Sequence, residues 1–272
     1  MTQALKLSPE IIKLQEDIAV LEKELGKVIL ERDEMLNTVK PNLEAEYQKK
    51  IGYKELKRME TEITARRFKR QIELIQAAVN RQESIEEKEI GNQLDDEFQE
   101  WYKKIEEEYR KMKEAEDRLN CLMSDEENAE FTKLYRQLVF KLHPDLNPNQ
   151  TKDEENLWHR VQMAYEGGDL EEMRSLAIIL DAQHETVELP SSKDVLQKRK
   201  EKLTEQIQKT INTMSELEQK FPFNIIGKLA DNDWVNTKVE EIQEQVNQWQ
   251  EKCKHYEDLI KVLLVNKSAG VN

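Results

Sequence analysis

The 272-residue chain has few residues that turn or break a helix, with only 7 glycines and 6 prolines. Aromatic residues make up 6%, and hydrophobic residues 38% against roughly 45–50% in typical globular domains. An apolar run of 18 residues is also missing, so we expect no transmembrane helix. Long helices need few turns and expose much surface. The composition therefore predicts an all-α protein with elongated helices and argues against a thick core built around a sheet.

Cysteine is equally scarce. Cys121 and Cys253 lie far apart and lack the spacing of metal ligands. This usage is typical of a reducing compartment and argues against a zinc module. The first ten residues, MTQALKLSPE, contain no apolar signal-peptide segment. We therefore expect a cytoplasmic protein.

Charge is abundant and mostly of one sign. Charged residues reach 36%, against roughly 25% in typical domains, and the formal net charge is −14. An acidic surface repels phosphate, so nucleic acid and anionic membranes are not expected partners. One basic run, Arg66, Arg67, Lys69 and Arg70, departs from this pattern. We interpret it as a solvated helix face paired with neighbouring acids, with an RNA or ribosome contact as the alternative.

A heptad pattern dominates the first 40 residues. Ser8 can cap a helix that opens with Pro9, and Pro41 is expected to end it. One position of the series, Arg32, is polar, and either fixes the register of the pairing or extends its side chain to solvent. The apolar positions alternate by three and four: Ile11, Leu14, Ile18, Leu21, Leu25, Val28, Met35 and Val39. Residues 1–40 are therefore predicted to form a helix that buries a narrow stripe against another helix.

Further long helices are predicted on both sides of the middle of the chain. Residues 41–123 read as a long helical coiled-coil region, and residues 183–191 as a linker. In residues 192–272, two apolar seams are joined by a short loop, which predicts an antiparallel helical hairpin that folds as its own unit. The sequence leaves open whether these arms pair within one chain or between copies in a homo-oligomer.

Residues 124–182 have a different character, with three short helices set off by strong start and stop signals. Capping boxes begin at Ser124 and Thr151, and Gly167-Gly168 stops the second helix. Between the first two helices lies the loop His143-Pro144-Asp145. We expect His143 and Asp145 to project from an exposed hairpin tip, beside a basic strip on the first helix formed by Lys133, Arg136 and Lys141.

This segment resembles a J domain. Leu134-Tyr135-Arg136-Gln137-Leu138 and the following Lys141-Leu142-His143-Pro144-Asp145-Leu146-Asn147-Pro148 are similar to helix II and its signature loop. Met163-Ala164-Tyr165-Glu166 resembles the end of helix III. J domains bind DnaK-type chaperones in the ATP state and stimulate ATP hydrolysis. The resemblance implies that His143, Pro144 and Asp145 engage such a chaperone, while Lys133, Arg136 and Lys141 contact its acidic ATPase domain.

The chain departs from the J-domain pattern in several places. No helix I is recognisable before Ser124, and its packing role is expected to fall to the preceding helix through Tyr109 and Leu119. No Gly/Phe-rich linker and no Cys-x-x-Cys repeats follow the segment. The helical arms are then expected to bind an unknown client or assembly. The alternative is a coiled-coil scaffold in which the J-like segment is only structural.

Other chemistry has little support in the sequence. His143, Asp145 and His159 do not have the spacing of a standard metal site. A nucleophilic triad would need a Ser or Cys context that the chain does not show. We therefore expect a binding protein with no enzymatic activity, metal or cofactor of its own.

Overall fold

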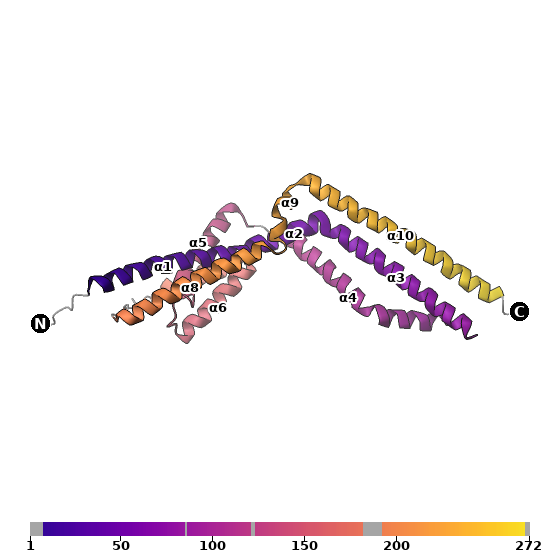
Figure 1. Cartoon of the computed structure of the whole chain (residues 1–272), viewed down its shortest axis with the longest axis horizontal. Helices are drawn as coiled ribbons and strands as arrows, with labels where there is room; N and C mark the ends of the chain where they lie inside the picture. Colours follow the sequence, from indigo (N-terminus) through magenta and orange to yellow (C-terminus); the bar gives the residue numbers. More distant parts are fainter. Residues whose placement is uncertain (1–7, 85, 121–122, 182–191, 270–272) are drawn as a thin grey trace. The chain divides into compact units, whose positions relative to one another are not determined.

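The computed structural model describes residues 8–84, 86–120, 123–181 and 192–269, and within these ranges it contains helices and turns but no strand. The prediction of an all-α fold is confirmed. The chain divides into two compact units (Figure 1). The first unit consists of residues 1–41 and 122–224, and the second of residues 42–121 and 225–272.

The first unit is built on two long helices that lie side by side and run in the same direction (Figure 1). These are α1 (Pro9–Glu34) and α8 (Lys193–Glu218). Lys193 pairs with Glu10 at 2.6 Å, and Lys200 pairs with Asp17 at 2.7 Å. Both partners advance by seven residues from one pair to the next, which is the heptad spacing typical of parallel helix pairs.

Three shorter helices pack on this pair: α5 (Asp125–Leu142), α6 (Lys152–Gly167) and α7 (Leu170–Asp181). One hydrophobic cluster joins all five helices. Among its members from α1 and α8 are Ile18, Leu25, Ile29, Leu196, Leu203 and Ile207, and among those from the shorter helices are Phe131, Leu138, Leu142, Val161, Met173 and Leu176. The predicted heptad stripe of the first helix is therefore buried by both α8 and the short helices.

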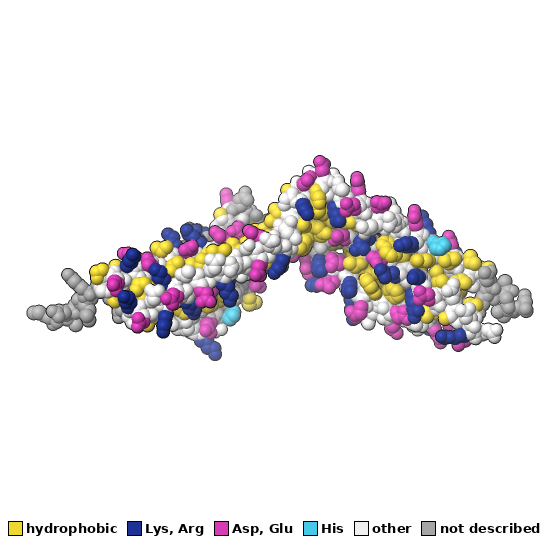
Figure 2. Space-filling model, viewed as in Figure 1, with side chains coloured by type: hydrophobic (Ala, Val, Ile, Leu, Met, Phe, Trp, Pro, Cys, Tyr) yellow, Lys and Arg dark blue, Asp and Glu magenta, His cyan; other side chains and the backbone are white. Residues whose placement is uncertain are grey.

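The second unit consists mainly of α3 (Tyr53–Asn80), α4 (Glu87–Asn120) and α10 (Asn232–Ala269). Helix α3 lies between the other two: it runs antiparallel to α4 and in the same direction as α10 (Figure 1). The second unit also contains η2 (Gln48–Gly52) and α9 (Ile226–Ala230), while α2 (Lys40–Tyr47) and η3 (Phe223–Ile225) cross the boundaries between the units. On the face drawn in Figure 2, acidic and basic side chains are interspersed over both units.

The predicted helix end at Pro41 is wrong. A π-helical turn, η1 (Met35–Val39), follows α1 and leads directly into α2, so that Pro41 lies in the first turn of α2. The Lys40 N–H bonds five residues back, to the Met35 carbonyl. A proline removes one helical N–H and its ring crowds the carbonyl four residues earlier. The wider π-helical turn shifts the hydrogen-bond partners just before Pro41, so the helix continues through the proline.

The predicted C-terminal hairpin is also wrong. Helix α8 packs against α1 in the first unit, and α10 packs against α3 in the second. A heptad seam shows that a helix packs against another helix, but it does not identify that helix. The length of the intervening loop does not identify it either, because the entropic cost of closing a loop grows slowly with loop length. The boundaries between the two units fall near residues 41, 122 and 224. The predicted linker at 183–191 lies outside the described residues.

This pairing changes the expected behaviour of the C-terminal segment. Expressed alone, residues 192–265 should show weak helicity and a broad, non-cooperative thermal transition by circular dichroism. The reason is that the apolar face of α8, including Leu196 and Leu203, would have lost α1 and the short helices. Measurement at two concentrations separates this behaviour from self-association. A sharp transition that is independent of concentration would contradict the observed pairing.

Candidate partner-binding site

The helices that flank the His-Pro-Asp loop begin and end at the predicted signals. Both capping boxes are formed, with Ser124 paired to Glu127 and Thr151 paired to Glu154. Helix α5 ends at Leu142, and the next residue, His143, has the extended backbone (φ −68°, ψ 130°) that a following proline favours. Helix α6 ends at Gly167, and Gly168 after it lies in the left-handed region, with φ 66°. These local features produce the antiparallel hairpin that the sequence predicts.

The loop folds back on its own first residue. The His143 carbonyl accepts hydrogen bonds from the N–H groups of Leu146 at 3.0 Å and Asn147 at 2.9 Å. The His143 imidazole Nδ1 accepts from the Asp145 N–H at 3.1 Å. The imidazole therefore helps to shape the turn that carries the aspartate.

His143 itself is buried, with 7% of its surface exposed, and the expectation that it projects from the tip is wrong. Its ring meets Trp158 of α6 edge-on, with the ring centroids 4.9 Å apart. Burial lowers the pKa of His143, and the nearby Arg32 guanidinium adds to this, while Asp145 and Asp33 oppose it. The sequence suggested that His143 and Asp145 both project from an exposed hairpin tip. Instead, the side that carries His143 packs into the core shared with α1 and α8.

The other two loop residues are more accessible. Pro144 is exposed, and Asp145 is partly exposed. The Asp145 Oδ1 accepts a hydrogen bond from Gln206 Nε2 of α8 at 2.7 Å. Beside it, Arg199 of α8 donates to the Leu146 carbonyl at 2.7 Å and also binds Glu22 of α1 at 3.0 Å. The loop is thus attached to a helix about 60 residues further along the chain.

The predicted basic strip is only partly available. Lys133 and Arg136 are exposed on α5, and neither lies at ion-pair distance from an acid in the part of the chain that the structure describes. Lys141 is partly buried and takes part in another interaction. Of the three residues of the predicted basic strip, Lys133 and Arg136 are therefore the two that are exposed.

An aromatic and ionic cluster fixes the hairpin on α1. The Tyr135 and Tyr165 rings stack with centroids 3.7 Å apart, and the Tyr135 hydroxyl donates to buried Asp33 of α1 at 2.5 Å. Arg32 binds the other Asp33 oxygen at 2.5 Å. Burial, together with the Asp33 charge, raises the pKa of Tyr135. Arg32, the polar position of the heptad series, thus compensates the charge of the buried Asp33 carboxylate. That carboxylate links α1 to α5.

Helix α1 also fills the place for which the sequence suggested the preceding helix. Tyr109, expected to pack beneath the hairpin, belongs to the second unit and donates a hydrogen bond to Glu60 of α3. Leu119, also named for that role, has no described side chain. At Gly26, a Cβ atom would lie 2.4 Å from Phe140 Cε1, so the Phe140 ring packs directly on the α1 backbone. The sequence signal for this contact is a glycine inside a heptad helix.

The basic run on α3 is confirmed as an ion-paired helix face. Arg66 binds Glu62 at 2.7 Å, Arg67 binds Asp95 at 2.7 Å, and Arg70 binds Glu97 at 2.8 Å. These acids compensate the positive charge that a phosphate ligand would need. The structure therefore favours the ion-paired interpretation of this cluster.

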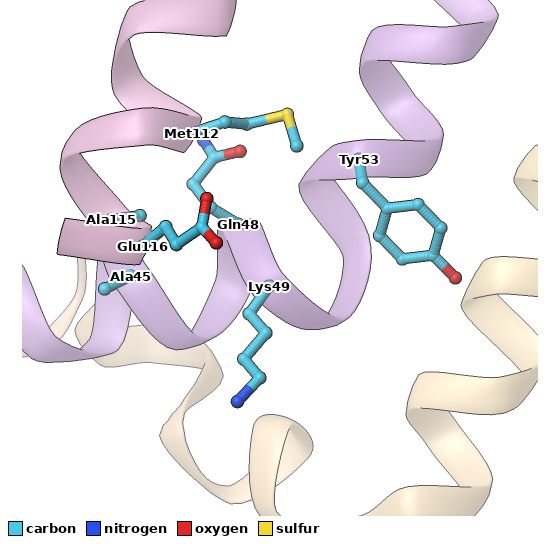
Figure 3. A pocket seen from close by; sticks show the side chains of 7 residues that line it. All are labelled: Ala45, Gln48, Lys49, Tyr53, Met112, Ala115 and Glu116. Atoms are coloured by element: carbon cyan, nitrogen blue, oxygen red, sulfur yellow. The ribbon is translucent and has the colours of Figure 1, made fainter. Parts of the chain in front are cut away.

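A surface pocket of about 270 Å³ lies between η2 and α4 in the second unit. Figure 3 shows that Lys49 and Tyr53 extend away from Met112 and Glu116, so its polar groups do not converge on one point. The lining residues are Ala45, Gln48, Lys49, Tyr53, Met112, Ala115 and Glu116. Among the described residues, no group of three His, Cys, Asp or Glu side chains is placed to hold a metal ion. No described helix is both long and apolar enough to cross a membrane.

Comparison with known proteins finds no matching family model, curated protein or solved structure. The likeness to J domains is carried by the residues quoted for it. Of these, Tyr135 and Leu138 are buried in the core with Tyr165 packed against them, and Arg136, Pro144 and Asp145 reach solvent.

Burial of His143 gives it a structural role that can be measured. We expect His143→Gln to lower the free energy of unfolding by about 1–3 kcal/mol, because the imidazole packing on Trp158 is lost and a polar amide is buried in its place. Chemical denaturation of the full chain measures this difference. Pro144→Ala, at the neighbouring exposed position, should change stability less. Equal stability of wild type and His143→Gln would contradict the buried placement.

The pKa of His143 also predicts how stability depends on pH. Because the folded pKa lies below the unfolded value of 6.5, the unfolded chain binds the proton more readily. The stabilising contribution is complete above about pH 6.5 and is lost as the pH falls towards the folded pKa. Melting temperatures between about pH 7.5 and 5.5 should fall more for wild type than for His143→Gln. Parallel curves would contradict a lowered pKa.

Proposed function

We propose that this chain is a co-chaperone of the J-domain type, which recruits a DnaK-type chaperone and stimulates its ATPase through the His-Pro-Asp loop. The carrying observation is the hairpin of α5 and α6, whose connecting loop presents exposed Pro144 and partly exposed Asp145. Helix α5, which leads into this loop, bears Lys133 and Arg136. The sequence resemblance adds the identity of the partner.

The charge distribution supports an acidic partner. In a chain of net charge −14, Lys133 and Arg136 are exposed and lack an ion-pair partner among the described residues. Two unpaired cations on one helix attract an acidic surface and orient it during association. The loop at the end of the same helix is then brought to the partner. In this proposal, Lys133 and Arg136 orient the partner during association, and Asp145 makes the specific contact with it.

The three loop residues have different roles in this proposal. His143 shapes the turn from inside through its imidazole, and Pro144 holds the helix end extended. Asp145 supplies the carboxylate that meets the chaperone. The second unit and the α1–α8 pair are the parts available for an unidentified client or assembly, and the setting that fits such a protein is the cytoplasm.

A second candidate is a scaffold protein in which the hairpin is purely structural. The burial of His143 and the hydrogen bond between Gln206 and Asp145 favour it, because both attach the loop to the rest of the unit. This candidate gives no role to unpaired Lys133 and Arg136. The two candidates differ in one measurable property, which is stimulation of a DnaK-type ATPase.

Charge reversal tests the steering face. Lys133→Glu combined with Arg136→Glu should weaken binding to the ATP-bound DnaK-type protein of the same cell by about tenfold or more at low salt, since a cationic face becomes anionic. Lys113→Glu with Lys254→Glu, at exposed positions of the second unit, makes the same change in net charge and should bind normally. Titration by fluorescence anisotropy at two salt concentrations measures both. Equal weakening by both pairs would mean that only net charge matters.

Asp145→Asn tests the loop separately. The amide keeps the shape of the side chain and can still accept the Gln206 hydrogen bond, so folding should be unchanged. Stimulation of single-turnover ATP hydrolysis should be lost, because the charge that engages the chaperone is gone. If wild type fails to stimulate every DnaK-type protein of the cell, the co-chaperone proposal is wrong. Full stimulation by Asp145→Asn would instead place the active contact elsewhere.

A further inference from the structure

The His-Pro-Asp loop is tied to a part of the chain that lies outside the J-like segment. Its ties come from α8, where Gln206 binds the Asp145 carboxylate at 2.7 Å and Arg199 binds the Leu146 carbonyl at 2.7 Å. Arg199 also contacts Glu22, so the same side chain connects the loop to both long helices. These side chains occupy acceptors on the loop that a partner would otherwise reach.

Helix α1 holds the end of α5 from a second direction. Phe140, three residues before His143, packs so closely on Gly26 that a Cβ there would lie 2.4 Å from its ring. Leu146, on the other side of the loop, is buried in the same cluster as α8 residues Leu203 and Ile207. The loop is therefore fixed at its carboxylate, at a backbone carbonyl and at both flanking apolar side chains.

We infer that the α1–α8 pair is a built-in clamp on the His-Pro-Asp loop, and that it keeps the J-like hairpin in a less active state until the loop is released. The inference rests on the proposed co-chaperone function. The Asp145 oxygen bound by Gln206 is on the same carboxylate that the proposal assigns to the chaperone. A partner that needs this carboxylate must compete with Gln206, so apparent affinity falls with the fraction of chains that are closed.

The clamp is suited to reversible release. Gln206 contributes one neutral donor to Asp145, and its own Oε1 atom is buried without a hydrogen-bond partner in the described structure. A buried amide oxygen with no donor is unfavourable, which lowers the net stability of the closed arrangement. A client or assembly factor that binds α1 or α8 and shifts them against the short helices would free Asp145.

Two glutamines of α8 provide a matched test. Gln206→Leu removes the amide that binds Asp145, whereas Gln208→Leu makes the same change at an exposed position whose amide binds only Asn212 of the same helix. In single-turnover assays with the ATP-bound DnaK-type protein, Gln206→Leu should reach half-maximal stimulation at about fivefold to tenfold lower concentration than wild type, as expected for loss of one hydrogen bond to a carboxylate. Gln208→Leu should behave as wild type.

A second variant opens the clamp from α1. Gly26→Leu places a side chain where Phe140 now packs and should also increase stimulation, while Gly91→Leu, at a helical glycine with open space around it, should not. Circular dichroism checks that each variant is folded. If Gly26→Leu fails to fold, the two glutamine variants decide the question alone.

A readout without the chaperone separates the clamp from the function. Amide hydrogen exchange at Leu146 and Asn147, which bond the His143 carbonyl, should be faster in Gln206→Leu than in Gln208→Leu or wild type. If wild type and Gln206→Leu stimulate equally, the clamp is overturned while the co-chaperone function stands. A loss of stimulation in Gln206→Leu also overturns it, because Gln206 would then support the active loop. If no chain stimulates, the proposed function fails and the clamp with it, whatever the exchange rates show.

Discussion

The parallel pairing of α1 with α8 is the constraint on which the first unit depends. It joins residues 183 positions apart through ion pairs that recur every seven residues, at Glu10–Lys193 and Asp17–Lys200. Such exposed pairs contribute little stability individually, typically about 0–1 kcal/mol, but they specify register. The stability comes from the apolar seam between them, with Leu25 and Leu203 fully buried. Without this pair, the short helices would have only one another to pack against.

The J-like hairpin is fixed on this platform by a buried carboxylate. Asp33 accepts from the Tyr135 hydroxyl at 2.5 Å and is compensated by Arg32. A buried charge is costly unless it is paired and hydrogen-bonded, so a rotation of α5 that moves the Tyr135 hydroxyl away from Asp33 is unfavourable. Phe140, further along α5, packs on Gly26 of the same helix α1. Helix α1 therefore contacts α5 directly, close to the candidate site.

The local parts of this structure follow from the sequence. The structure has the capping boxes at Ser124 and Thr151 and the helix stop at Gly167-Gly168 as predicted. Each depends only on contacts between residues that are close in the sequence. The partner of α8 and the burial of His143 were not predictable in this way. Each depends on residues from another part of the chain, and a heptad seam does not identify the helix against which it packs. Pro41 shows a further limit, because a π-helical turn next to a proline leaves no simple sequence signal.

The same distinction between local contacts and contacts with distant parts of the chain applies to the candidate site. Lys133, Arg136 and Pro144 are exposed as the hairpin pattern predicts, since their positions depend on α5 and its loop alone, whereas Asp145 is only partly exposed and binds Gln206 of α8. The contacts of Gln206 and Arg199 were missed, because two polar residues in a long charged helix resemble any solvated face. Their signal becomes visible only when α8 is placed beside the loop. These contacts of α8 are the basis of the proposed clamp on the His-Pro-Asp loop.

The most direct test of this account is hydrogen exchange of the full chain with and without a saturating ATP-bound DnaK-type chaperone. We expect opposite changes in two segments. Residues 133–147 should gain protection as the chaperone covers α5 and the loop, and residues 196–207 of α8 should lose protection as the loop leaves them. Unchanged exchange in both segments, under conditions where the chaperone is folded and binds ATP, would contradict the account.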